Sequence, residues 1–170
     1  NAAVAVSVLP EDYGKNPAGA IQFQRRLEQA AFTAGGEDYC APCQSVGHFF
    51  AGRPGGFGGR IAPSYRNGRV RPADFHTLLP AFVCDMLKEG LHRFSKKVAG
   101  YNAPDVPLTG IETRTSAPVR ILRGDDLTAI GHRLVYPCGE GAGYAGGIMS
   151  AAADGMRVAL AILSRFRREI

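Results

Sequence analysis

The segment 139–155, GEGAGYAGGIMSAAADG, contains the residues best suited to bind a ligand. Gly141, Gly143 and Gly146 have the spacing G-x-G-x-x-G, in which glycines allow a tight turn and the close approach of a pyrophosphate. A helix that starts directly after such a turn adds free backbone N–H groups and the positive end of its dipole. The alternative is a tight connection that uses glycine for its backbone freedom alone. Five glycines between 139 and 147 favour a ligand.

This spacing normally opens a dinucleotide-binding βαβ unit, yet only 24 residues follow Gly146. They suffice for one helix and not for a helix with a returning strand. We therefore expect a short buried strand over 134–137, the glycine-rich turn, and a last helix over 147–167. Glu140 then lies at the strand tip, where a carboxylate accepts hydrogen bonds from sugar or ribityl hydroxyls.

Cys40 and Cys43 form a C-x-x-C pair in YCAPC. The spacing allows a redox-active dithiol or half of a zinc site. A zinc site needs two further soft ligands, and no second compact pair of Cys or His exists, so we predict no metal. We favour two free thiols, with a thiol redox protein as an alternative.

Helical periodicity predicts two further helices and leaves an irregular region between them. The first helix covers 17–34, from Pro17 to the stop at Gly35-Gly36, and the second covers 80–97. Residues 37–79 are expected to be mostly loop, with a short helix over 43–51. Alternation predicts a strand over 3–9, and the β-branched run 108–122 predicts two strand pieces, because Pro118 cannot donate a sheet hydrogen bond. On the last helix we expect the apolar face to contain Ile148, Ala152, Gly155, Met156, Ala159 and Ile162.

Composition narrows the classes of protein. The chain has 170 residues, 45% of them hydrophobic, with net charge +5 and four cysteines. No apolar run is long enough to span a membrane, and no secretory signal is present, so we expect a cytoplasmic protein that is not bound to a membrane. The chain begins with Asn1, which suggests part of a longer polypeptide. The Gly/Arg loop GRPGGFGGR (52–60) leaves a polyanion- or nucleic-acid-binding module as an alternative, although we consider nucleic acid unlikely because repeated RGG units are absent.

The closing sequence YPCGEGAGYAGGIMSAAADGMRVALAI closely resembles the end of bacterial FAD-dependent dehydrogenases of the NAD(P)/FAD-dependent oxidoreductase type. FQRRLEQAAF, AGRP and GIETRTSAPVRILR are also typical of this family. The resemblance implies an α+β fragment of a two-domain flavoprotein, with a mixed sheet, about three main helices, and the closing strand–helix of the FAD domain at its C-terminus. Residues 1–107 would form the substrate or cap region, and 108–170 the return into the FAD domain.

The resemblance also implies roles for particular residues. Gly139, Glu140, Gly146, Gly147, Ile148 and Met149 would bind FAD, with Glu140 near the ribityl phosphate and the helix start facing the isoalloxazine ring. Arg114, Thr115, Ser116 and Arg120 would contact the flavin ring or an anionic substrate. The N-terminal remainder of the FAD domain is the implied partner, and NAD(P)H the implied electron donor. The substrate and the catalytic residues stay unknown.

Overall fold

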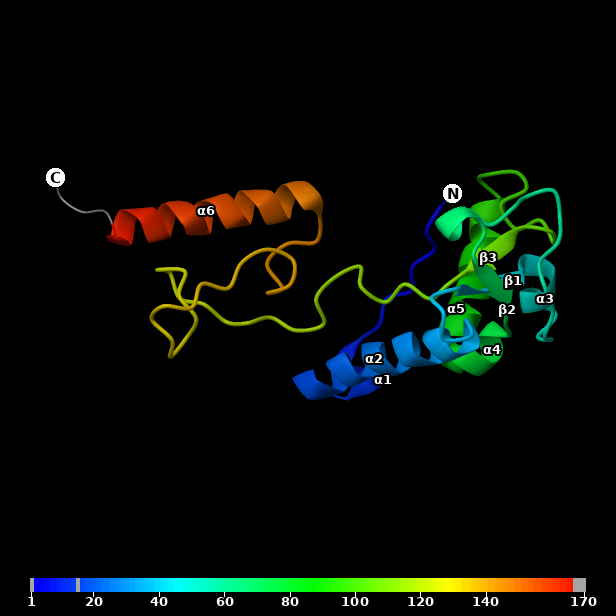
Figure 1. Ribbon diagram of the computed structural model, residues 1–170, viewed down its shortest axis with the longest axis horizontal. Coiled ribbons are helices and arrows are strands. Elements are labelled where there is room, and N and C mark those ends of the chain that lie inside the picture. The colour runs from blue at the N-terminus through cyan, green and yellow to red at the C-terminus, as the bar shows by residue number, and fades with distance from the viewer. Residues whose placement is uncertain (1, 15, 167–170) are drawn as a thin grey trace. The chain divides into compact units, whose positions relative to one another are not determined.

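The computed structural model describes residues 2–14 and 16–166, and its chain divides into two compact units. The first unit comprises the N-terminal residues to Asp12 and Phe23–Thr113. The second comprises Tyr13–Gln22 and the residues from Arg114 onward. The described residues form six α-helices, one short 3₁₀ helix and one three-stranded mixed sheet (Figure 1). The fold is therefore α+β, and its three long helices are those that the sequence predicts: α2 (Pro17–Ala34), α5 (Ala81–Ser95) and α6 (Ile148–Phe166).

The sheet of the first unit has the order β2-β1-β3. Its central strand β1 (Ala41–Ser45) pairs in parallel with β2 (Val70–Pro72) and antiparallel with β3 (Pro107–Thr109). Cys43 stands opposite both Pro72 and Thr109. Residues 37–79 are mostly irregular, as expected, but they also contain two of the three strands, which were not predicted. These strands have three to five residues and contain prolines, so no alternating pattern reveals them.

Helix α5 (Ala81–Ser95) confirms the helix predicted over 80–97, and it contributes to the buried core of the first unit. The buried cluster contains one residue of α3 (Val46–Phe50), one of α4 (Phe75–Leu78) and two of α5: Phe49, Phe75, Cys84 and Leu91. The short helix expected over 43–51 is present, but Cys43–Ser45 belong to β1. Buried Gln44 satisfies both ends of its amide: its Nε2 donates to the Arg53 carbonyl at 2.9 Å, and its Oε1 accepts from the Phe75 N–H at 3.2 Å.

Helix α2 spans Pro17–Ala34, as the sequence predicts. It ends in a Schellman motif, in which the Gly36 N–H donates to the Thr33 carbonyl and the Glu37 N–H to the Phe32 carbonyl. Gly36 supplies the left-handed conformation that this ending requires, with φ 83°.

The strand predicted over 3–9 is not formed, and α1 (Pro10–Tyr13) follows it. Val4 and Val6 are half-buried, and Val4 packs against the core cluster. The alternating pattern therefore reflects the partial burial of Val4 and Val6. The segment is not a strand because, among the described residues, no neighbouring strand pairs with its backbone.

The second unit contains α6 (Ile148–Phe166), which confirms the predicted last helix as far as Phe166; Arg167 lies outside the described residues. The other strand predictions were wrong. From 108–122 a strand forms only within β3, and the closing strand expected over 134–137 is replaced by irregular backbone. Leu134 and Val135 are 73% and 52% exposed, so their apolar side chains do not make the buried strand that the pattern suggested.

The predicted inner face of α6 was also wrong. Ile148 and Met156 are 89% and 67% exposed, whereas Val158 is buried and Asp154 half-buried. The helix is rotated from the expected position because Asp154, not an apolar residue, turns inward to an arginine partner described below.

Candidate functional site

The glycine-rich segment 139–147 leads into α6 and contains two overlapping backbone turns within residues 139–144. The Gly143 N–H donates to the Glu140 carbonyl at 2.9 Å, and the Tyr144 N–H donates to the Gly139 carbonyl at 3.0 Å. Gly139 and Gly143 have φ 69° and 83°, a backbone conformation that favours glycine. Part of the glycine content is thus required by the turns themselves.

Gly143 is also fixed by close packing. A Cβ at this position would lie 2.6 Å from the Val119 carbonyl oxygen and 2.9 Å from the Arg120 Cα. The Ile121 N–H donates to the Ala142 carbonyl at 3.2 Å, and Arg120 Nε donates to the Gly143 carbonyl at 2.8 Å. Residues 119–121 therefore cross directly over the glycine-rich segment, and Gly143 makes this crossing possible.

Three glycines of the segment have no such reason within the chain. A Cβ on Gly141 or Gly146 would meet nothing within 4 Å, and one on Gly147 would meet only the Ser150 Oγ at 3.8 Å. None of the three has a left-handed φ. The turn alone does not explain these positions, which leave an open surface beside the start of α6.

An ion pair holds the glycine-rich segment against α6. The Arg123 guanidinium donates to both carboxylate oxygens of Asp154, at 3.0 Å and 2.6 Å, and to the Pro137 carbonyl at 2.7 Å. Asp154 also accepts from the Gly139 N–H at 2.9 Å. The two side chains are only 6% and 13% exposed. The hydrogen bond from Arg123, followed by that from Gly139, lowers the pKa of Asp154 from 3.8 to about 2.

Tyr144 completes this network. Its hydroxyl donates to the Ile121 carbonyl at 3.0 Å and accepts from the Arg123 N–H at 3.1 Å. Its ring lies under the Arg123 guanidinium, 3.7 Å from ring centroid to Cζ, and Arg120 lies 5.1 Å from the same centroid. Cation–π attraction is strongest where water is excluded, so the buried Arg123 is the stronger partner.

The start of α6 is open. Ile148 and Met149 are 89% and 81% exposed, and Ser150 Oγ donates to the Gly147 carbonyl at 3.0 Å. The first N–H groups of a helix have no partner within the helix, and they carry its positive end. Glu140 is half-buried in the turn that precedes this helix start. The arrangement can bind an anionic or hydrogen-bond-accepting group.

The structure unites some of the predicted site residues. Gly139, Glu140, Gly146, Gly147, Ile148 and Met149 form one continuous surface segment, and Arg120 reaches it through Gly143. Arg114, Thr115 and Ser116 are exposed residues of the same unit, upstream of the crossing. Their assigned contacts with a flavin or a substrate remain predictions.

Sequence reasoning missed the residues that hold this segment: Arg123, Asp154 and Tyr144. The available signal was Asp154 itself, a single carboxylate among the small residues of SAAADGM. A charge in such a run is expected to have a partner if the surrounding face is buried. Its partner is 31 residues away in sequence, so spacing alone does not identify Arg123.

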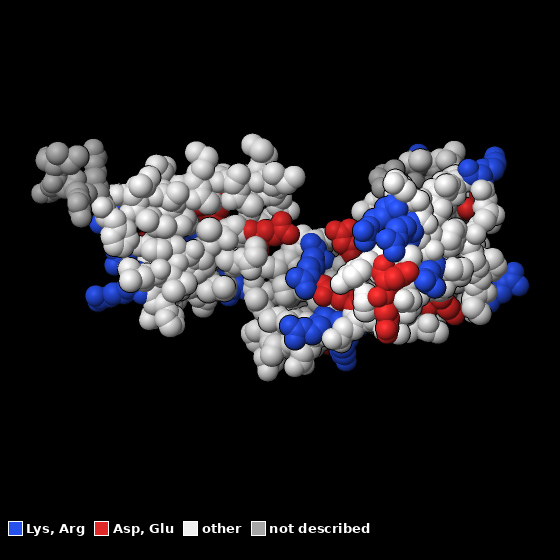
Figure 2. Space-filling model, in the orientation of Figure 1, with Lys and Arg blue, Asp and Glu red and all other residues white. Residues whose placement is uncertain are grey.

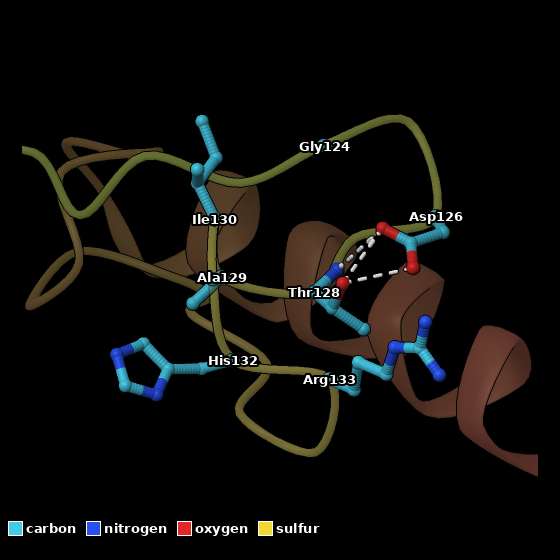
Figure 3. Close-up of a pocket in the computed structure, with 8 residues that line it drawn as sticks. Gly124, Asp126, Thr128, Ala129, Ile130, His132 and Arg133 are labelled. Atoms are coloured by element: carbon cyan, nitrogen blue, oxygen red, sulfur yellow. Dashed lines mark hydrogen bonds between the residues drawn. The ribbon is translucent and has the colours of Figure 1, made fainter.

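A hollow of about 320 Å³ lies within the loop 124–133, at the other end of α6. Figure 3 shows the Asp126 carboxylate turned toward Thr128, to which it is hydrogen-bonded, while the side chains of His132 and Arg133 point in different directions. The hollow therefore has no converging reactive groups.

The two cysteines of the C-x-x-C pair are free and lie in different environments. Cys43 is fully buried in β1, and Thr109 Oγ1 donates to its sulfur at 3.6 Å. Burial raises the pKa of the Cys43 thiol. Cys40 is half-buried just before the strand. This environment disfavours the Cys43 thiolate that redox exchange requires.

Several arginines near the Gly/Arg loop are paired. Arg60 contacts Asp105 at 3.3 Å, and Arg71 contacts Asp38 at 3.0 Å. Figure 2 shows basic and acidic side chains interspersed on the visible face of the first unit. Within the described chain, no helix is long and apolar enough to cross a membrane, and no group of three or more His, Cys, Asp or Glu side chains could hold a metal ion.

An open helix start, approached by glycines and preceded by a carboxylate, is typical of a protein that binds a phosphorylated or heterocyclic cofactor. Comparison with known proteins identifies the family: residues 1–115 match the FAD-dependent protein, C-terminal domain-like family, and the chain belongs to it. An uncharacterized protein of Clostridium beijerinckii is 47% identical over 167 residues, or 98% of this chain. The match covers 31% of that protein, so the chain spans about a third of its relative. Membership associates the chain with FAD.

Proposed function

We propose that this chain is the C-terminal part of an FAD-dependent oxidoreductase, in which segment 139–149 closes the flavin site and the first unit forms the substrate region. The observation that carries the proposal is the open glycine surface at Gly141, Gly146 and Gly147, where side chains are absent without a reason inside the chain. A cofactor in close contact with the backbone supplies that reason. The residues present therefore fit the group that the family implies.

Each part of the segment has a separate task in this proposal. Glu140 would accept hydrogen bonds from ribityl hydroxyls, and the N–H groups at Gly147–Met149 would hold an electron-rich part of the ring. The positive end of α6 would stabilise negative charge there. Bound FAD supplies the redox chemistry, accepting and passing on electrons. Arg123 and Asp154 act as positioning residues because they hold Gly139 against α6.

The exposed face of α6 supports a larger assembly. Six large apolar side chains of this helix are between 57% and 89% exposed: Ile148, Met149, Met156, Leu160, Leu163 and Phe166. In Figure 2 the surface over α6 is mostly free of charged groups. Exposed apolar area on this scale marks an interaction surface. We propose that the remainder of an FAD domain, of the kind that the longer relative has room for, covers it.

The test uses the protein encoded by the complete reading frame. Its visible spectrum should show bound flavin. The flavin absorbance should be lost in Glu140→Ala and in Gly147→Val. It should be kept in the control Glu89→Gln, which removes only an exposed ion pair with Arg93 on α5. A full-length protein that neither contains flavin nor takes it up from added FAD would refute the proposal. Reduction of the bound flavin by NADH or NADPH tests the further proposal of a nicotinamide donor; no bleaching with either would exclude it.

A further inference from the structure

The first unit contains a second site, separate from the glycine-rich segment. A cleft of about 490 Å³ is lined by the second half of α2, the 3₁₀ helix (Tyr65–Asn67) and two further segments. One segment, 39–42, leads into β1, and the other, 109–112, follows from the end of β3. All residues that line the cleft belong to the first unit. They are mainly apolar, and they include three aromatic and two acidic side chains.

The three aromatic residues that line the cleft, Phe32, Tyr39 and Tyr65, are all exposed. Phe32 and Tyr39 lie with ring centroids 5.1 Å apart and are 38% and 67% exposed. Tyr65 closes the same wall, and its hydroxyl donates to the Tyr39 carbonyl at 3.5 Å. Exposed ring faces in a concave wall can stack on a flat ligand and attract a cation.

The backbone of Tyr39 is strained. Its φ is 61°, in the left-handed region that bulky residues rarely adopt. Strain of this kind is concentrated at ligand sites, where the surrounding structure fixes the residue in place. At this position the side chain of Tyr39 lines the cleft and is 67% exposed.

The charged residues that line the cleft are acidic, whereas the net charge of the chain is positive. Glu28 and Glu112 line it, and none of its lining residues is Lys, Arg or His, although the chain has net charge +5. Glu28 accepts a hydrogen bond from Thr113 Oγ1 at 2.8 Å, and Gln24 Nε2 donates to the Thr113 carbonyl at 2.8 Å. These bonds fix the acidic wall to α2. The nearby Arg71 is paired with Asp38.

We propose that this cleft binds a flat aromatic molecule that bears a protonated amine. The rings of Phe32 and Tyr39 receive the aromatic part, and the carboxylate of Glu112 receives the amine. The site goes beyond the proposed flavin function and needs no bound flavin, so the two can fail independently.

The first test measures binding of tryptamine to the 170-residue chain. The chain contains no tryptophan, so the indole fluorescence of the probe reports binding by its anisotropy. Tryptamine should bind saturably, and indole-3-propionate, with the same ring and the opposite charge, roughly tenfold more weakly. Glu112→Gln should raise the Kd about threefold, and the control Glu89→Gln should leave it unchanged. Equal affinity for both probes, or no effect of Glu112→Gln, overturns the proposal.

A second test locates the ligand. Cys40 lines the cleft, whereas Cys138 belongs to the second unit. Saturating tryptamine should slow alkylation of Cys40 by iodoacetamide several-fold and leave the rate at Cys138 unchanged, as read from the two peptides by mass spectrometry. An unchanged rate at Cys40, or equal slowing at both cysteines, places the probe elsewhere and overturns the assignment.

Discussion

Arg123 and Asp154 form a bidentate ion pair, with N–O distances of 3.0 Å and 2.6 Å. Arg123 follows the crossing residues 119–121, and Asp154 lies on α6. The same carboxylate binds the Gly139 N–H, so one side chain links three parts of the second unit. The geometry of the glycine-rich segment therefore depends on Asp154, a residue that lies outside this segment.

Replacing Asp154 with Asn should destabilise the second unit. The change leaves the Arg123 guanidinium, 6% exposed, without its counter-charge, and breaking a buried pair on one side costs roughly 3 kcal/mol. Urea unfolding followed by circular dichroism measures the loss. Glu89→Gln removes an exposed pair on α5 and should leave the midpoint nearly unchanged. Similar midpoints for the two variants would show that the Arg123–Asp154 pair contributes no more than a surface pair.

The same pair predicts a dependence of stability on pH. Because folding lowers the pKa of Asp154 from 3.8 to about 2, its contribution is present above pH 3.8 and is lost as the pH falls toward 2. The difference in unfolding midpoint between the wild type and Asp154→Asn should therefore shrink across this interval. A difference that stays constant down to pH 2 would mean that the carboxylate is not held ionised by Arg123.

Replacement of two glycines of the segment with alanine should affect stability to different extents. Gly143→Ala puts a Cβ into a left-handed residue and against the Val119 carbonyl, so we expect a loss of about 2 kcal/mol. Gly141→Ala meets open space at an ordinary φ and should change stability by less than about 1 kcal/mol. Thermal unfolding of both variants distinguishes them. Equal destabilisation would contradict the division of the glycines into packing and open positions.

The four thiols should react in two classes. Cys43 and Cys84 are buried, and burial raises the pKa of both, so at neutral pH they should react slowly with Ellman's reagent. Cys40 and Cys138 are accessible and should react first. Counting the thiols that react before and after denaturation measures this. Rapid loss of Cys43 together with Cys40, or a disulfide between them, would support the thiol redox alternative instead.

The sequence predicts the long helices well because their signal is local. Pro17 and the Gly35-Gly36 stop mark α2, and periodicity marks α5 and α6. The sheet was not predictable in the same way, since β1 is held by strands that are distant along the chain and too short to show a pattern. The glycine spacing pointed to the candidate site, but only coordinates separate Gly143, which packs against Val119, from Gly146, which faces open space.

The position of β1 has a consequence for biosynthesis. Thr109, which pairs with Cys43, lies 66 residues further along the chain, and β2 reaches β1 only through a parallel crossover. On a ribosome, β1 therefore emerges long before both of its neighbours. Closing so long a loop costs conformational entropy before any contact forms. We expect the first unit to complete its sheet only after β3 has left the exit tunnel.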